Sequence, residues 1–213
     1  MRHSIAPSVT FFALTLGLLL GNARAQSSPS NEAAKSQTTG DGQAVTLALV
    51  SDVESMDGII AAVYDVISGP AGKKRDWGRM RSLFVPGARL MPTSPVPMPR
   101  AAPGAPLTGA ERYQTQVLDV DGFIARSSKY LEEQGFFERE TARRVESYGH
   151  IAHVWSTYES RHKADDAKPF ARGINSIQLM NSGSRWWVVG IFWEQETPRT
   201  QIPSKYLKSV RRP

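Results

Sequence analysis

The stretch from residue 170 to residue 196, FARGINSIQLMNSGSRWWVVGIFWEQE, constrains the fold more than any other part of this chain. It predicts two apolar β-strands joined by a tight turn at Asn-Ser-Gly-Ser. Side chains alternate along a strand, so the second strand would be apolar on both faces. A sheet packed on one side only would carry polar residues on the other side, so this strand needs two apolar partners. One face would hold Trp187, Val189, Ile191 and Trp193, and the other Trp186, Val188 and Phe192.

The first 25 residues have the pattern of a secretory signal peptide. Arg2 provides the basic start, residues 9–20 form the apolar run, and Ala23-Arg24-Ala25 is a small-x-small cleavage site. The apolar run is shorter than the roughly 20 residues that span a bilayer. We therefore expect cleavage near Ala25 and an exported bacterial protein, periplasmic or secreted, without a stable membrane anchor.

The charge of the chain is uneven. The net charge is +6, and the tail at 199–213 carries five lysine or arginine residues and no acid. The high pI is therefore mostly an effect of this tail, which we expect to be solvated. Nucleic-acid binding would need basic residues clustered on the folded face, so it is not expected. The chain has no cysteine, so an exported form would be held together without disulfides.

One domain is expected over residues 45–198, after a disordered linker at 26–44 that lacks apolar residues and periodicity. Helical spacing of apolar residues predicts a helix over 53–68, with Ser51 or Asp52 as its N-cap. Two further helices are expected, at 77–84 after Asp76 and at 122–134 after Asp119 or Asp121. The basic triplet at 73–75 is interpreted as a solvated loop.

A segment rich in proline separates the second and third expected helices. Residues 86–106 hold seven prolines, which exclude a helix or a central strand there, although a short strand or turn can begin at 85–91. We expect an extended surface loop, either a lid or binding loop or an insertion without a role.

Strands follow the third helix. Residues 136–148 are mostly charged, as in an exposed or edge strand, and residues 150–162 follow after a glycine turn. With the hairpin at 170–196 they predict an antiparallel sheet of three or four strands. Helices first and a sheet afterwards indicate the α+β class.

This order of elements resembles the nuclear-transport-factor-2-like (NTF2-like) superfamily, in its SnoaL-like and ketosteroid-isomerase-like branch. Three stretches carry the resemblance: YDVISG followed by DWGRMRSLFVPGARL, the G-x-x-A-x-V strand at 149–154, and the aromatic-Trp-x-x-Glu ending at 192–196. The resemblance implies a cone-shaped roll, in which three N-terminal helices pack inside a strongly curved antiparallel sheet with a pocket at its open end. It also implies a homodimer through the convex sheet face, formed by Trp186, Val188 and Phe192.

Ketosteroid-isomerase-like members use an aspartate base, a tyrosine and a protonated aspartate. Position by position, the resemblance matches the tyrosine with Tyr64, but it puts the base near Met91-Pro92, where no carboxylate exists, and the acid near Arg172. His153 could act as a general base instead, with Tyr64 as acid, since histidine titrates near neutral pH. His150 and His153 would point to opposite faces, so no metal site is expected, and no cofactor motif is found.

Three functions stay open at this point. The first is binding of a small apolar or aromatic molecule in the conical pocket, with Arg172 as anchor for an anionic or carbonyl group. The second is an isomerase, dehydratase or cyclase that uses His153 and Tyr64. The third is a protein-interaction module that docks a partner through the proline-rich loop. The residues expected to line the pocket are Tyr64, His153, Trp155, Arg172, Ile174, Trp187 and Trp193.

Overall fold

The computed structural model describes residues 48–96 and 112–208. The expected signal peptide, the expected linker at 26–44 and residues 97–106 of the proline-rich loop lie outside these ranges. In chain order the elements are α1 (Val50–Val53), α2 (Met56–Ile67), α3 (Trp77–Leu83), β1 (Phe84–Pro95), β2 (Tyr113–Thr115), α4 (Val120–Gln134), β3 (Phe137–Tyr148), β4 (Ile151–Arg161), β5 (Ala171–Asn181), β6 (Trp186–Gln195) and the 3₁₀-helix η1 (Ser204–Tyr206).

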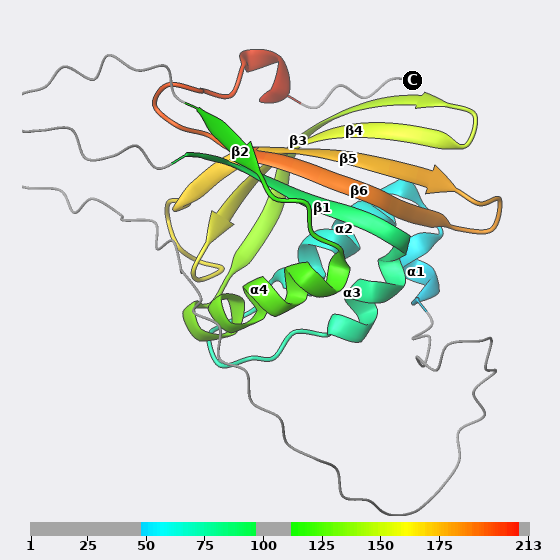
Figure 1. Ribbon diagram of the computed structural model, residues 1–213, viewed down its shortest axis with the longest axis horizontal. Coiled ribbons are helices and arrows are strands. Elements are labelled where there is room, and N and C mark those ends of the chain that lie inside the picture. Colours follow the sequence, from blue (N-terminus) through cyan, green and yellow to red (C-terminus); the bar gives the residue numbers. More distant parts are fainter. Residues whose placement is uncertain (1–47, 97–111, 209–213) are drawn as a thin grey trace, which may run out of the picture. The chain divides into compact units, whose positions relative to one another are not determined.

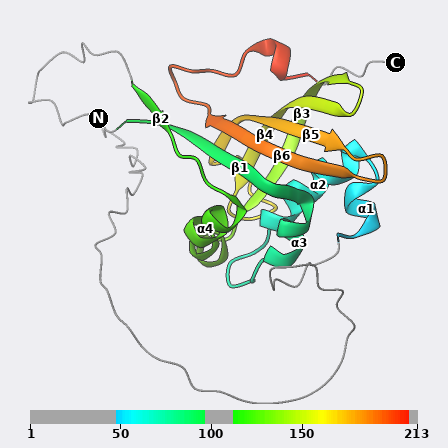
Figure 2. The same ribbon diagram turned by 45° about the vertical axis from the view of Figure 1, so that its right-hand side comes forward.

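The architecture is α+β, with three N-terminal helices, a six-stranded mixed sheet, and a fourth helix, α4, between β2 and β3. The strand order is β2-β1-β6-β5-β4-β3, and every pair is antiparallel except β1 with β6, which is parallel. The four α-helices lie on one face of the sheet, here called the inner face, and η1 lies on the outer face (Figures 1 and 2). The expected sheet of three or four antiparallel strands was therefore too small, and the sheet is twisted but not strongly curled.

The core lies between α2 and the inner face of the sheet. Apolar residues at helical spacing in α2 pack against every second residue of the central strands, and this packing buries apolar surface. Ile59 and Ile60 of α2 are fully buried, as are Val154 of β4 and Ile177 of β5. No helix in the described ranges is long and apolar enough to cross a membrane.

The start of the first expected helix differs from the prediction. Ser55 is the N-cap of α2, and its Oγ accepts a hydrogen bond of 2.9 Å from the backbone N–H of Gly58. Asp52 instead lies in the separate short helix α1 and is buried. Its carboxylate accepts two hydrogen bonds from Arg79 of α3, at 2.7 and 2.8 Å. A buried carboxylate needs such a partner, so Asp52 ties α1 to α3.

The caps of the other two helices agree with the sequence. Asp76 accepts a hydrogen bond of 2.8 Å from the backbone N–H of Arg79, and Asp119 accepts one of 2.7 Å from Gly122. The solvated loop expected at 73–75 is wrong for Arg75, which is buried. Its guanidinium donates to the carbonyl oxygens of Ile67, Gly69, Pro70, Lys73 and Leu131. Arg75 thereby joins the end of α2 to α4.

Strand β1 runs through prolines that were expected to exclude a central strand. It pairs with β6 on one side and with β2 on the other. Pro86 lies within a register irregularity between Phe84 and Arg89, and such bulges accommodate proline. At Pro92 the carbonyl oxygen is the paired group, because it accepts from the Gln116 N–H at 3.2 Å. Both prolines therefore fit into β1, because Pro92 pairs through its carbonyl oxygen and Pro86 lies in a bulge.

The turn between β5 and β6 is the tight turn expected, with Gly183 at φ 93°. The faces of β6, however, were half wrong, because Val189 is an extra residue between the pairs Leu179–Val188 and Gln178–Gly190. A bulge of one residue reverses the alternation. The residues that face the core are therefore Trp186 and Val188 on the N-terminal side of the bulge. On its C-terminal side they are Ile191 and Trp193. Val189 and Phe192 are 41% and 44% exposed.

The tail expected to be solvated from residue 199 packs on the outer face of the sheet. Ile202 is buried, and the ring of Tyr206 lies 5.6 Å from that of Trp155. The Thr157 hydroxyl donates to the Tyr206 carbonyl oxygen at 2.6 Å, and the Ile202 N–H donates to Glu196 at 3.0 Å. We call residues 197–206 the C-terminal strap.

Candidate functional site

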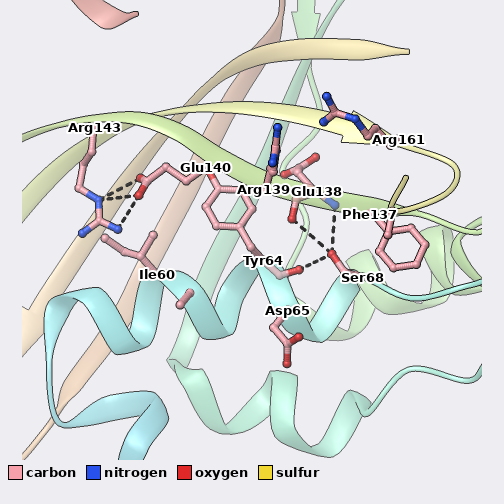
Figure 3. Close-up of a pocket in the computed structure, with 12 residues that line it drawn as sticks. Ile60, Tyr64, Asp65, Ser68, Phe137, Glu138, Arg139, Glu140, Arg143 and Arg161 are labelled. Atoms are coloured by element: carbon pink, nitrogen blue, oxygen red, sulfur yellow. Dashed lines mark hydrogen bonds and ion pairs between the residues drawn. The ribbon is translucent and has the colours of Figure 1, made fainter. Parts of the chain in front are cut away.

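A pocket of about 430 Å³ lies between α2 and the edge strand β3, and Figure 3 shows it in close-up. Its volume falls in the range of small-molecule sites, about 300–1,000 Å³. We call it the α2–β3 pocket. Its lining mixes apolar and charged side chains: Ile60, Ala61, Tyr64, Asp65, Ser68, Phe137, Glu138, Arg139, Glu140, Arg143, Arg161 and Ala164.

Glu138 is held at the inner side of this pocket by hydrogen bonds on its backbone and its carboxylate. Its backbone N–H donates to the Ser68 hydroxyl at 3.0 Å, and that hydroxyl donates to the Tyr64 carbonyl oxygen at 2.7 Å (Figure 3). The buried Ser160 hydroxyl donates to the Glu138 Oε2 at 2.8 Å. Burial raises the pKa of Glu138 to about 7, although hydrogen bonds from Ser160 and Asn175 oppose the shift.

The Tyr64 hydroxyl belongs to a directed chain of hydrogen bonds. Asn175 Nδ2 donates to it at 3.1 Å, and it lies 2.7 Å from the Ser156 Oγ. The Ser156 hydroxyl donates to Glu140 Oε1, so the hydroxyl proton of Tyr64 is directed to Ser156. Burial, with the Glu138 carboxylate as a smaller cause, raises the pKa of Tyr64 well above its usual range. Tyr64 is therefore neutral at physiological pH.

Glu140 is fixed by an arginine from its own strand. Arg143 donates to Glu140 from Nε at 2.9 Å and from Nη2 at 2.6 Å (Figure 3). Arg143 also pairs with Asp57 of α2. Bidentate pairing of this kind fixes the orientation of a carboxylate. The two carboxylates of the pocket thus differ, because Glu140 is paired with a cation while Glu138 accepts hydrogen bonds from neutral groups.

This arrangement has a defined chemical capacity. A carboxyl group with a pKa near 7 is present in both protonation states at neutral pH, which suits a general acid or base. A neutral tyrosine beside it donates a hydrogen bond without changing charge. Pairs of titratable groups in contrasting environments mark functional sites more often than other surfaces.

Of the seven residues predicted to line the pocket, Tyr64 is the one that does so. His153, its expected catalytic partner, lies on the outer face, because Ala152, Val154, Ser156 and Tyr158 are the inward residues of β4. The His153 Nε2 lies 2.9 Å from the Ser176 Oγ, and its ring lies 4.7 Å from that of Trp155. The pair His153 and Tyr64 was therefore wrong as a single site.

The other predicted residues are divided between the two faces. Trp193 packs against Phe123 of α4, with ring centroids 6.2 Å apart, and Trp187 lies under the Arg185 guanidinium at 3.6 Å. Arg172 pairs with Glu196 at 3.5 Å, outside the α2–β3 pocket. Trp155, Ile174 and Trp193 do come together, but in a smaller cavity beneath the C-terminal strap.

The sequence analysis missed Glu138, Ser156, Ser160 and Asn175. The signal was present in β4, where Ser156 and Ser160 share the parity of Val154 and Tyr158 and so belong to the core face. Buried polar residues at core-facing positions need partners, and these partners are Tyr64 and the carboxylates of β3. The charged composition of β3 predicted an exposed or edge strand. It is an edge strand, but Glu138 and Glu140 point inward.

Within residues 48–96 and 112–208, no group of three or more histidine, aspartate or glutamate side chains is arranged to hold a metal ion. No protein-family model matches the chain, and no curated protein matches it. Among solved structures, it is similar to an NTF2-like protein of unknown function from Methylobacillus flagellatus KT, at 14% identity and a TM-score of 0.35. The match covers 67% of this chain and 95% of that one. At this TM-score the likeness carries no argument about fold or function.

Proposed function

We propose that this protein is an NTF2-like domain that binds a small, partly apolar molecule in the α2–β3 pocket. The observation that carries the proposal is Glu138, a carboxylate that lines a pocket of about 430 Å³ and has a pKa of about 7. Apolar side chains such as Ile60 and Phe137 would contact the body of the ligand, and Glu138 would contact one polar group. The element order, with helices ahead of a mixed sheet, supports the fold family.

The experiment is native mass spectrometry of the protein purified from its own host, with a variant that fills the pocket. Ala61 lines the pocket and is exposed on α2, so Ala61→Trp is expected to fold and to block the site. The control is Glu54→Trp, at an exposed residue outside the lining. We expect a reproducible extra mass on the wild type and the control but not on Ala61→Trp. An extra mass retained by Ala61→Trp would contradict this site.

A second candidate function is proton transfer, as in an isomerase or lyase. Glu138 would accept a proton from a carbon of the bound molecule as general base. This replaces the pair His153 and Tyr64. The test is turnover of whichever molecule is found bound. Glu138→Gln, which cannot accept the proton, should abolish turnover while the extra mass is retained.

Export and dimer formation are further proposals. The pattern ending at Ala25 supports a mature chain that begins at Gln26, which intact-mass measurement after expression in a bacterial host would test. We propose that the outer sheet face pairs with a second copy through Trp187, Val189 and Phe192, where Trp187 and Val189 replace Trp186 and Val188 of the first expectation. Val189→Glu should then convert a dimer to a monomer in light scattering. A wild-type monomer would contradict that proposal.

A further inference from the structure

The cavity beneath the C-terminal strap is a second, separate site. It has a volume of about 240 Å³ and lies on the outer face of the sheet, away from the α2–β3 pocket. Its floor comes from β4, β5 and β6, with Trp155, Ile174 and Phe192, and its roof is formed by strap residues 200–203. The volume is below the roughly 300 Å³ at which drug-sized sites begin. An occupant must therefore be small.

The strap is tied to the sheet at both ends of the cavity. On one side the Ile202 N–H donates to Glu196 at 3.0 Å, and Ile202 itself is buried. On the other side Thr157 donates to the Tyr206 carbonyl oxygen at 2.6 Å, and the ring of Tyr206 packs on Trp155. The roof is therefore part of the folded domain.

The lining has the chemistry that attracts a cation. Two aromatic residues of the outer face, Trp155 and Phe192, share the lining with two acids, Glu194 and Glu196, and none of its twelve residues is lysine, arginine or histidine. Arg172 at 3.5 Å partly neutralises Glu196. Glu194 has no ion-pair partner among residues 48–96 and 112–208. Aromatic faces and carboxylates together favour an organic cation over an anion or a neutral molecule.

We propose that this cavity binds a small organic ammonium ion, with its apolar groups against Trp155 and Phe192 and its charge compensated by Glu194. This inference is independent of the function proposed for the α2–β3 pocket. Lys205 of the strap lies over the Tyr206 ring at 4.8 Å, outside the lining. No lysine or arginine belongs to the cavity lining, so a bound cation would make the cation–π contact there.

The test uses the full chain and two probes of equal shape. Choline is compared with its neutral carbon isostere, in which carbon replaces the quaternary nitrogen, by saturation-transfer NMR and calorimetric titration. We expect saturable binding of choline and binding at least about tenfold weaker for the isostere, since a cation–π contact in a desolvated site is worth about that factor. Equal binding of the two probes, or no binding of choline, would overturn the proposal.

Two variants locate the site. Trp155→Leu and the isosteric Glu194→Gln should each weaken choline binding about tenfold or more. The matched control is Glu146→Gln, an exposed acid on β3 outside the lining, which should bind as the wild type does. Thermal unfolding of each variant shows that it is folded. Folded Glu194→Gln that binds choline with unchanged affinity would overturn the assignment of the charge.

Discussion

Tyr64 and His153 lie on opposite faces of the sheet, although the strand that carries His153 also supplies the residue that binds the Tyr64 hydroxyl. That residue is Ser156, three positions after His153, and its Oγ lies 2.7 Å from the hydroxyl. Residues three apart on a strand point to opposite sides. The sheet therefore separates two sites, one on each of its faces.

Tyr64 and His153 should act on stability independently. Tyr64→Phe should lower the free energy of unfolding by about 1–3 kcal/mol, because Asn175 and Ser156 lose a buried partner. His153→Ala should lower it by about 1 kcal/mol. In urea unfolding, the double variant should equal the sum within about 0.5 kcal/mol, as for sites without shared partners. A coupling above about 1 kcal/mol would contradict the separation.

Stability should depend on pH through Glu138. Its pKa is near 4.5 when unfolded and about 7 when folded, so the folded state binds the proton more tightly between these values. The free energy of unfolding should therefore fall as pH rises from about 4.5 to about 7, by about 2 kcal/mol, and this contribution stays constant at higher pH. Glu138→Gln should lose this dependence and be more stable than the wild type at pH 8. An unchanged pH profile in that variant would contradict burial as the cause.

Arg75 should be the most sensitive cation of the loop between α2 and α3. Arg75→Met leaves the carbonyl oxygens of Gly69 and Leu131 without a donor and should lower the free energy of unfolding by about 2–4 kcal/mol. The neighbouring Lys74 is exposed, so Lys74→Met should change it by less than about 0.5 kcal/mol. Chemical denaturation measures both. Equal effects would mean that the loop is solvated throughout.

The bulge in β6 predicts an unusual tolerance to deletion. Removal of Val189, the extra residue, leaves Val188 and Ile191 on the inner face and should lower the free energy of unfolding by about 1 kcal/mol or less. Removal of Phe192 instead turns Trp193 away from the core and should lower it by more than about 3 kcal/mol. Thermal unfolding of the two deletions compares them directly. The reverse order would contradict the register.

Local signals predicted much of this fold, and longer-range pairing decided the rest. Asp76 and Asp119 cap helices as their sequence context indicates, and the turn at Gly183 joins the expected hairpin. The strand through Pro92 and the bulge at Val189 depend on which carbonyl or residue meets a neighbouring strand. A local pattern does not contain that information.

The candidate site was less accessible to sequence reasoning than the fold. Tyr64, which was expected in the conical pocket, lines the α2–β3 pocket. Glu138 sits in a strand that alternates acidic and basic residues, and its position resembles a solvated face until α2 is known to cover it. Its pKa arises from burial between elements about 70 residues apart in sequence, through contacts such as Glu138 with Ser68.

The most direct test of the central claim is an NMR titration of the Glu138 carboxyl carbon in the folded protein, with Glu138→Gln to assign the signal. The account predicts a midpoint about pH 7, because the carboxyl group is buried in the α2–β3 pocket. It also predicts that binding of the ligand found in the pocket shifts this midpoint. A midpoint near 4.5, the ordinary value, would show a solvated carboxylate and would contradict the proposed site.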